Sequence, residues 1–406
     1  MGLSKRQWEE AESNGFVSLD KQVCSGCVGD DDYLIGIVNQ HGSRGLCSYC
    51  CKKNKRVVDY DSIAEIITLM IRHDYSRAID ELPYDNESED GFLEGCVMNS
   101  FDLFESLDLG INSDFDEDIR RNFDDDLWCE SDWAGLDPDE YLIHSWRTFC
   151  DEIKYRTRFF FLNIIESGYQ GLPIARILDV IKETITESGL FFKLPAGTSI
   201  HRARLVDNGE DFSCAAELGP PPREKAVASR MSPAGIAHFY GAFDAVTAAA
   251  ETLPRNSHAA RMCFGEWKTT KTLTVINLTT LPKFPSRYDL DRRPELDQLW
   301  FLNSFIRAIA SPIEKDGREH IDYVPSQIVS EYLRTVVRND EGFPVDGIIF
   351  PSSRNLGKCL TLFFDKESCA DLGKENEETV IILNKSCVKL VGQESDLVIP
   401  KTIKGW

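Results

Sequence analysis

The sequence predicts an α+β protein, in which a mixed β-sheet domain follows a mostly helical region and a small cysteine-rich knuckle. Apolar residues recur at helical spacing in the first half, where Ile63 and Ile67 share one helix face. From Gly189 onward, short runs of β-branched and aromatic residues alternate with helical stretches, as in a mixed sheet. We therefore expect three parts, at 1–56, 57–188 and 189–406.

Turn and capping signals divide these parts into expected elements. Residues 20–56 carry few helix signals, whereas Asp61 and Ser62 suit the start of a helix. Further helices are expected at 141–165, with Phe160 and Leu162 facing inward, and from Pro173 to Gly189. In the C-terminal part we expect strands on either side of a turn at 195–197 and at 237–240, 272–278, 345–350, 359–364 and 379–383, with helices at 241–251, 295–310 and 325–338.

Length and composition favour a globular protein of the cytoplasm. The 406 residues are 42% hydrophobic and 10% aromatic, which excludes a disordered chain. No run of 18 apolar residues occurs, and the start MGLSKRQWEE lacks the apolar core of a signal peptide, so no membrane association is expected. Thirteen cysteines, an odd number, argue against a secreted disulfide framework.

The negative charge is concentrated in an acidic segment at 80–140. This segment holds 22 acidic residues against Arg120 and Arg121 alone, so it carries about −20 of the net charge of −22. A solvated surface that keeps the protein soluble is the simplest interpretation. A docking surface for a basic partner is the alternative, and nucleic acid is disfavoured because phosphate would be repelled.

Four of the cysteines have the spacing of a metal site. Cys24 and Cys27 form one CxxC knuckle, and Cys47 and Cys50 form a second, with 19 residues between them. Two such knuckles can supply the tetrahedral S₄ set of a structural zinc ion, which leaves no open position for catalysis. Cys51 in place of Cys50, nearby His41, or four reduced core thiols are the alternatives.

The stretch SRMSPAGIAHFYGAFDAVTAAAE, from Ser229, has the composition of a pocket floor. Arg230 stands in a loop, a Pro/Gly turn follows, and a short strand carries Tyr240. An alanine-rich helix then ends on Glu251. Because small side chains let another backbone approach, we expect this acid to face a nucleotide pocket.

Several stretches of the C-terminal part resemble the RES domain, which is named for its Arg, Glu and Ser. They are IHRARL, the stretch from Ser229 to Glu251, DYVPSQIVSEYLR and DGIIFPSSR. The N-terminal part, with CSGC, CSYC, DLWC and the helix around Trp146, is similar to the domain called HEPN/RES. His201 stands where the family commonly has an aromatic residue, and Met231–Ser232 where it has Trp–Asn.

The resemblance implies an ADP-ribosyltransferase-like fold and the cleavage of NAD⁺ between nicotinamide and ribose. Members of the family act as toxins of toxin–antitoxin systems or in phage (antiviral) defence. Some are hydrolases, some phosphorolyse NAD⁺, and a few modify a protein. HEPN nucleases carry Arg with His four to six residues later, a pair that the helix at 141–165 lacks, so RNase activity is not expected.

The same resemblance implies residue roles. Breaking the glycosidic bond creates an oxocarbenium-like ribosyl cation, which an anion stabilises while arginines hold the diphosphate. Glu251, Arg202 and Ser352 are the expected catalytic residues. The expected NAD⁺-binding residues are Arg230, Tyr240, His201, Arg204 and Ser353. Arg223 and Lys225 are candidates for a closing loop, although a solvated loop is the favoured interpretation. Tyr323 and Gln327 are candidates for further lining, with a helix start as the equal alternative.

Three functions remain open at this stage. The first is an NAD⁺ glycohydrolase or phosphorylase, with NAD⁺ as substrate and zinc as a structural ion. The second is an ADP-ribosyltransferase acting on a protein or nucleic acid, and the third is a non-enzymatic acidic binding module. A homo-oligomer and a protein inhibitor or activator are the expected partners.

Overall fold

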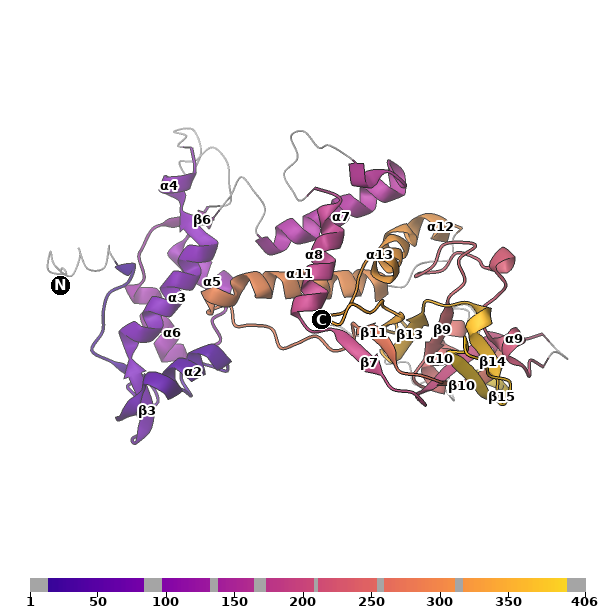
Figure 1. The fold of residues 1–406 in the computed structure, drawn as a ribbon. Helices are drawn as coiled ribbons and strands as arrows, with labels where there is room; N and C mark the ends of the chain where they lie inside the picture. The colour runs from indigo at the N-terminus through magenta and orange to yellow at the C-terminus, as the bar shows by residue number, and fades with distance from the viewer. Residues whose placement is uncertain are drawn as a thin grey trace. The chain divides into compact units, whose positions relative to one another are not determined.

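The chain divides into two compact units in its computed structural model, which describes residues 14–83, 97–131, 138–163, 173–207, 211–253, 259–310 and 317–392. One unit comprises Met1–Tyr141 with Lys283–Gln298, and the other Leu142–Pro282 with Leu299–Trp406 (Figure 1). The boundaries predicted after residues 56 and 188 stay predictions.

The N-terminal unit combines two small three-stranded sheets with short helices. Its core surrounds the fully buried side chains of Tyr60, Phe104, Phe115 and Trp128. The sheets have the orders β1-β3-β2 and β4-β6-β5. The elements are β1 (Gln22–Cys24), α2 (Asp32–His41), β2 (Ser43–Gly45), β3 (Lys55–Asp59), α3 (Tyr60–Asp74), β4 (Tyr75–Arg77), α4 (Ala78–Glu81), β5 (Met98–Asn99), α5 (Ser100–Leu107), α6 (Ser113–Asn122) and β6 (Leu127–Glu130).

Helix α2 lies inside the cysteine-rich region, where no helix was expected. Its start is fixed by Asp31, whose carboxylate accepts hydrogen bonds from the backbone N–H groups of Tyr33 at 2.9 Å and Leu34 at 3.2 Å. Leu34 and Val38 are buried on one face of this helix. The prediction failed because the helix is only ten residues long and buries only these two residues.

The described parts of the acidic segment belong to this packed unit. Arg77 pairs with Asp124 at 2.5 Å and with Asp126 at 3.0 Å, and Arg120 pairs with Asp116 at 2.7 Å. These arginines balance part of the local negative charge. Residues 84–96 and 132–137 of the segment lie outside the described residues.

The C-terminal unit is built on a nine-stranded mixed sheet with the order β14-β15-β10-β8-β9-β13-β12-β11-β7. Its strands pair antiparallel except β11 with β12 and β14 with β15, so the predicted α+β class is confirmed. The strands are β7 (Phe191–Leu194), β8 (Ser199–Leu205), β9 (Phe239–Ala242), β10 (Ala259–Thr269), β11 (Leu273–Asn277), β12 (Gly347–Pro351), β13 (Lys358–Leu362), β14 (Cys369–Asp371) and β15 (Ile381–Gly392).

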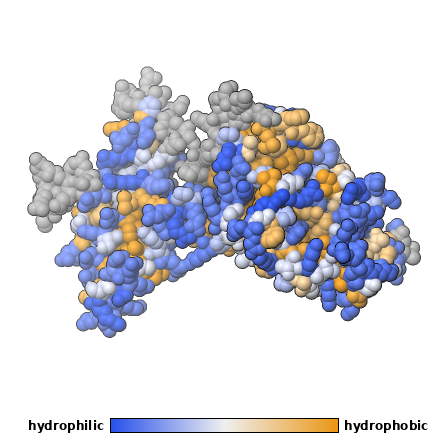
Figure 2. Space-filling model, viewed as in Figure 1, coloured by the Kyte–Doolittle hydropathy of each residue, from blue (hydrophilic) through white to orange (hydrophobic). Residues whose placement is uncertain are grey.

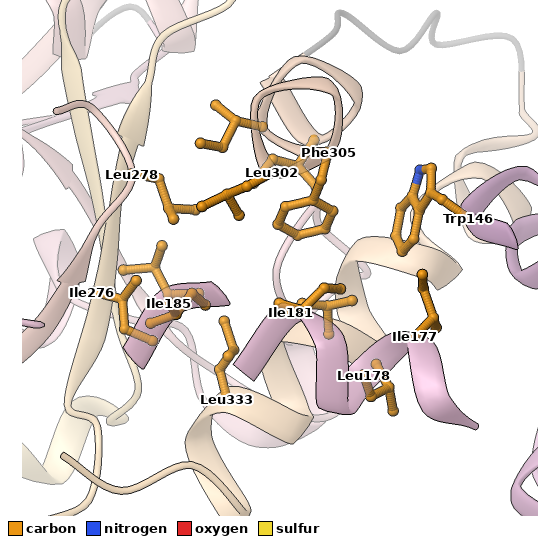
Figure 3. Close-up of a cluster of buried hydrophobic side chains, with 14 of the residues drawn as sticks. Trp146, Ile177, Leu178, Ile181, Ile185, Ile276, Leu278, Leu302, Phe305 and Leu333 are labelled. Carbon is orange, nitrogen blue, oxygen red and sulfur yellow. The ribbon is translucent and has the colours of Figure 1, made fainter. Parts of the chain in front are cut away.

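Helices pack their apolar stripes against this sheet. Figure 3 shows Ile181 and Ile185 together with Phe305 and Leu302, beside Ile276 of β11. The Trp146 and Phe305 rings meet edge to face at 5.1 Å. The helices are α7 (Pro138–Tyr155), α8 (Arg176–Glu187), α9 (Ala215–Leu218), α10 (Ala245–Thr252), α11 (Arg293–Ala310), α12 (Glu319–Asp322) and α13 (Val324–Thr335).

Helix α7 ends earlier than predicted, at Tyr155. The Arg158 guanidinium donates to the carbonyls of Ile153 and Lys154, both at 3.3 Å, and so satisfies the last turn. Phe160 and Leu162, predicted to face inward, are 74% and 59% exposed. Hydrophobic surface gathers on this unit where Figure 1 draws the end of α7 (Figure 2). Within the described ranges, no helix combines the length and apolarity that crossing a membrane requires.

Candidate active site

A pocket of about 330 Å³ opens where strands β8 and β9 part. The two strands are joined by a single pair, His201 with Ala242, so the sheet is split beyond it. Side chains from β8, β9, α10, α12–α13 and the loop before β9 surround the opening. Six of the predicted residues line it, namely His201, Arg202, Arg230, Tyr240, Glu251 and Tyr323, whereas Ser352 lies behind Glu251 and outside the lining.

Small residues bring helix α10 close to the sheet. Ala248, Ala249 and Ala250 are all buried, and the Thr252 hydroxyl reaches the Ala203 carbonyl of β8 at 3.2 Å. Asp244 caps the helix by accepting from the Thr247 backbone N–H at 2.7 Å. The helix therefore delivers Glu251, at its C-terminal end, to the edge of the pocket.

The Glu251 carboxylate is held by Ser352. The Ser352 hydroxyl donates to Glu251 Oε1 at 2.5 Å and accepts from the Arg354 backbone N–H at 3.1 Å. Ser352 is 1% exposed, whereas Glu251 is an exposed residue. One carboxylate oxygen is thus anchored to the protein, while the residue retains access to solvent at the pocket.

Two residues that the sequence did not single out complete this corner. The Arg354 guanidinium donates hydrogen bonds to two carbonyl oxygens at the C-terminal end of α10. One belongs to Ala250, at 3.1 Å, and the other to Leu253, the residue after the helix, at 2.5 Å. Cys359 on β13 lines the pocket. Burial and then the Glu251 carboxylate raise the pKa of the Cys359 thiol, which argues against a thiolate nucleophile.

The loop between β12 and β13 is close-packed against α10. At Gly357 a Cβ atom would lie 1.9 Å from the Thr247 hydroxyl oxygen, so any other residue would require the Thr247 side chain or the loop backbone to move. The Asn355 side chain donates to the same Thr247 hydroxyl at 3.2 Å and accepts from the Gly357 N–H at 3.0 Å. This packing fixes the loop that carries Ser352.

Arg202 occupies the split between the strands. Its Nη1 donates to the Tyr240 carbonyl at 2.9 Å, and its guanidinium lies 5.3 Å from the centre of the Phe239 ring. Burial lowers the pKa of Arg202 to about 10. Its Nε is buried without a hydrogen-bond partner among the described residues. A half-buried cation with an unused donor is suited to an anionic ligand.

The loop that carries Arg230 is fixed from several directions. The Tyr240 hydroxyl bonds with Ser229 at 2.5 Å and Ser232 at 3.0 Å. The Gln327 amide donates to the carbonyls of the same two serines, at 2.8 and 3.1 Å. Arg230 itself donates to the Ile309 carbonyl at 2.5 Å. Gln327 therefore positions this loop instead of lining the pocket.

The other predicted residues lie apart from the pocket. Arg204 stacks on Phe212 at 4.6 Å and donates to the Glu217 carbonyl. Ser353 is next to Ser352 but does not line the pocket. Arg223, a candidate for a closing loop with Lys225, is exposed and pairs with Asp365 at 2.7 Å.

The four predicted cysteines of the N-terminal unit form one cluster. The sulfur atoms of Cys24, Cys27, Cys47 and Cys50 all lie within 4.8 Å of one another. Sulfur–sulfur distances of 3.7–3.8 Å match the edge of about 3.8 Å that a tetrahedron with Zn–S bonds of about 2.3 Å requires. Cys51 is exposed with a φ of 54°, which excludes it from the cluster.

Comparison with known families agrees with this architecture. The model of the HEPN/RES N-terminal domain 1 matches residues 40–167, and the model of the RES domain matches residues 201–380. The chain is a RES-domain protein. The RES match contains every residue named around the pocket. No curated protein and no solved structure was found to match.

The RES domain relates the chain to NAD-using enzymes of the toxin and effector class. The HEPN/RES match extends from the end of α2 beyond the end of α7. The cysteine cluster therefore begins outside that match and ends within it. The cluster has the donor set to bind a metal ion.

Proposed function

We propose that this RES-domain protein cleaves the glycosidic bond between nicotinamide and ribose in NAD⁺, as a glycohydrolase or phosphorylase. The observation that carries the proposal is the anchored Glu251 carboxylate in the same pocket as the half-buried Arg202. The Glu251 carboxylate can stabilise a developing ribosyl cation, and the Arg202 guanidinium can bind the diphosphate. We further propose a toxin or defence effector as the biological class.

Glu251 provides the negative charge that the reaction needs. As nicotinamide departs, positive charge develops on the ribose, and a fixed carboxylate stabilises that charge more than it stabilises the substrate. Ser352 holds one oxygen at 2.5 Å, so the carboxylate does not need to reorient during the reaction. The second oxygen is available to the ribose hydroxyl groups.

The pocket volume limits which part of the substrate is enclosed. About 330 Å³ is at the lower end of the roughly 300–1,000 Å³ that is typical of ligand sites. The pocket therefore suits the nicotinamide riboside half, with Tyr240 shaping its wall and the adenosine half extending outward. Arg202 and Arg230 contact the diphosphate at the junction between the two halves.

The direct test is the product pattern from NAD⁺ and the purified full chain. Nicotinamide release with repeated turnover and no added acceptor supports cleavage. Production of ADP-ribose alone indicates hydrolysis, whereas a phosphate-dependent sugar phosphate indicates phosphorolysis. Label transfer to a protein or nucleic acid without free turnover would instead support the ADP-ribosyltransferase alternative.

A matched pair of arginine variants tests the diphosphate assignment. Arg202→Gln should raise the KM for NAD⁺ by about 10- to 100-fold, because hydrogen bonds to charged groups are worth roughly 1.5–3 kcal/mol. Arg204→Gln, two residues along the same strand, should leave the KM unchanged because its guanidinium lies against Phe212. Equal effects would contradict the assignment.

For the cysteine cluster, we propose a structural zinc ion. The four thiolates fill all four positions of a tetrahedral site, so the ion would tie β1 and the turn after β2 together. It would take no part in the cleavage reaction. Homo-oligomerisation and a regulatory protein partner stay predictions.

A further inference from the structure

A second cavity of about 370 Å³ lies in the C-terminal unit and shares no lining residue with the active-site pocket. Its apolar wall consists of Ile236, Ala237, Phe363 and Phe364. The two cavities lie at opposite ends of β13. Phe363 and Phe364, which follow the C-terminal end of the strand, line this cavity, whereas Cys359 at its N-terminal end lines the active-site pocket. Three charged side chains also line it, those of Arg223, Arg334 and Asp365.

The charges around this cavity leave one cation without a partner. Arg223 is neutralised by Asp365, through contacts of 3.2 Å from Nε and 2.7 Å from Nη2 to one carboxylate oxygen. Arg334, in the last turn of α13, makes no hydrogen bond or ion pair with any described residue. The lining therefore has a net charge of one positive unit, which suits a monoanion better than a dianion.

A buried histidine, His238, packs against Phe363 of the apolar wall. His238 is 4% exposed, and its ring lies 5.2 Å from that of Phe363. Neither ring nitrogen makes a hydrogen bond of standard geometry with a described residue, although the Met231 backbone is close enough to interact with the ring. Arg334 is close enough to act on His238 electrostatically.

We propose that this cavity binds a monocarboxylate with a compact, flat apolar body. The carboxylate pairs with the Arg334 guanidinium, in the two-point geometry that arginine offers to carboxylates. The apolar body packs against the apolar lining that Phe363, Phe364, Ile236 and Ala237 provide. Asp365 disfavours a phosphate, because a second negative charge would lie beside its carboxylate.

The carboxylate can belong to a free acid or to the C-terminal residue of a polypeptide. Both ligands present a carboxylate next to a compact apolar side chain or ring. The loop that begins at Ser229 connects the two cavities, since Arg230 lines the active site and Gly235 lines this one. The binding measurement below does not require enzymatic activity, so its outcome is independent of the function proposed above.

The test is titration calorimetry of the folded full chain with benzoate and with N-acetylphenylalanine, each beside its neutral amide. Wild type should bind an acid and not the corresponding amide. Arg334→Gln should weaken that binding at least tenfold, and Arg334→Lys should weaken it less. Arg338→Gln, four residues further on and exposed, is the matched control and should bind like wild type. Thermal unfolding verifies that each variant is folded.

The two acids distinguish the sources. Tighter binding of benzoate indicates a free acid, and tighter binding of N-acetylphenylalanine indicates a chain terminus. The proposal is overturned if neither acid binds, if the amides bind equally well, or if Arg334→Gln binds like wild type. Binding that is lost in Arg202→Gln and kept in Arg334→Gln would assign the ligand to the active site and would also overturn it.

Discussion

The Ser352 hydroxyl donates a 2.5 Å hydrogen bond to the Glu251 carboxylate, across 101 residues of sequence. The serine comes from the end of β12 and the glutamate from the end of α10. Two independent elements therefore converge on one carboxylate, and the pocket beside it contains the half-buried Arg202. This convergence is the basis of the proposed chemistry.

Replacing Ser352 by alanine should lower kcat for NAD⁺ cleavage by roughly tenfold or more. The carboxylate would lose its anchor and would have to be oriented during the reaction. Ser353→Ala is the matched control and should keep wild-type kcat, since among the described residues the hydrogen bond to Glu251 comes from Ser352 and not from Ser353. The opposite ranking of the two variants, measured by nicotinamide release, would show that the anchor has been assigned to the wrong serine.

Replacing Arg354 by alanine should destabilise the C-terminal unit by about 2 kcal/mol. The change removes charged hydrogen bonds to the carbonyls of Ala250 and Leu253, at the negative end of α10. Denaturant unfolding measures the loss, and kcat should fall with it because Glu251 lies in the same turn. Arg121→Ala, which removes only an exposed ion pair with Glu117, should change stability by less than about 1 kcal/mol. Equal losses in both variants would count against the capping role.

The cysteine cluster predicts different outcomes for two adjacent residues. Cys50→Ser should weaken zinc binding by more than about 100-fold, because even outer partners of metal ligands are worth about 10- to 100-fold. It should also lower the unfolding temperature of the N-terminal unit. Cys51→Ser should retain one zinc ion per chain, as measured by elemental analysis. If Cys51→Ser lost its zinc ion while Cys50→Ser retained it, the assignment of Cys50 as the fourth zinc ligand would be contradicted.

Burial, with Arg334 nearby, lowers the pKa of His238 to about 4. In the unfolded chain it is about 6.5, so between these values the unfolded state binds a proton that the folded state does not. The stability of the C-terminal unit should therefore fall as pH falls, by about 1.4 kcal/mol per unit below pH 6.5 from this group.

Urea unfolding at pH 7 and pH 5 measures this dependence. His238→Gln should reduce the loss on acidification by about 2 kcal/mol, because its amide takes up no proton in this range. His41→Gln, at the surface, should behave like wild type. An unchanged pH dependence in His238→Gln would show that the histidine is not held neutral.

The sequence predicted those parts of the fold and site in which local chemistry determines the outcome. The two CxxC knuckles predicted the four clustered sulfurs. The alanine run predicted a slim helix over 241–251, and the helix spans Ala245–Thr252 because Gly241 and Ala242 belong to β9. The choice between Cys50 and Cys51 depended on a left-handed backbone at Cys51, which spacing does not reveal. Arg354 was missed because the carbonyls it caps are about a hundred residues away in sequence.

Arg202 and Arg204 are alike in the sequence and differ in the fold. They project from the same strand, but β9 lies beside Arg202, whereas Arg204 reaches the Phe212 ring. Strand β10 was not predicted because its sequence contains a glycine and several charged residues. Its central place between β15 and β8 is set by long-range pairing.

NAD⁺ consumption by the wild type and by Glu251→Gln, measured as nicotinamide released per chain, decides whether this pocket is an active site. The variant should lose at least about a hundredfold in kcat, since removing a charge that acts in the transition state costs about 2.7 kcal/mol or more. Its fold and its affinity for NAD⁺ should be retained. Undiminished turnover in Glu251→Gln, with an active wild type, would contradict the proposed reaction at this carboxylate.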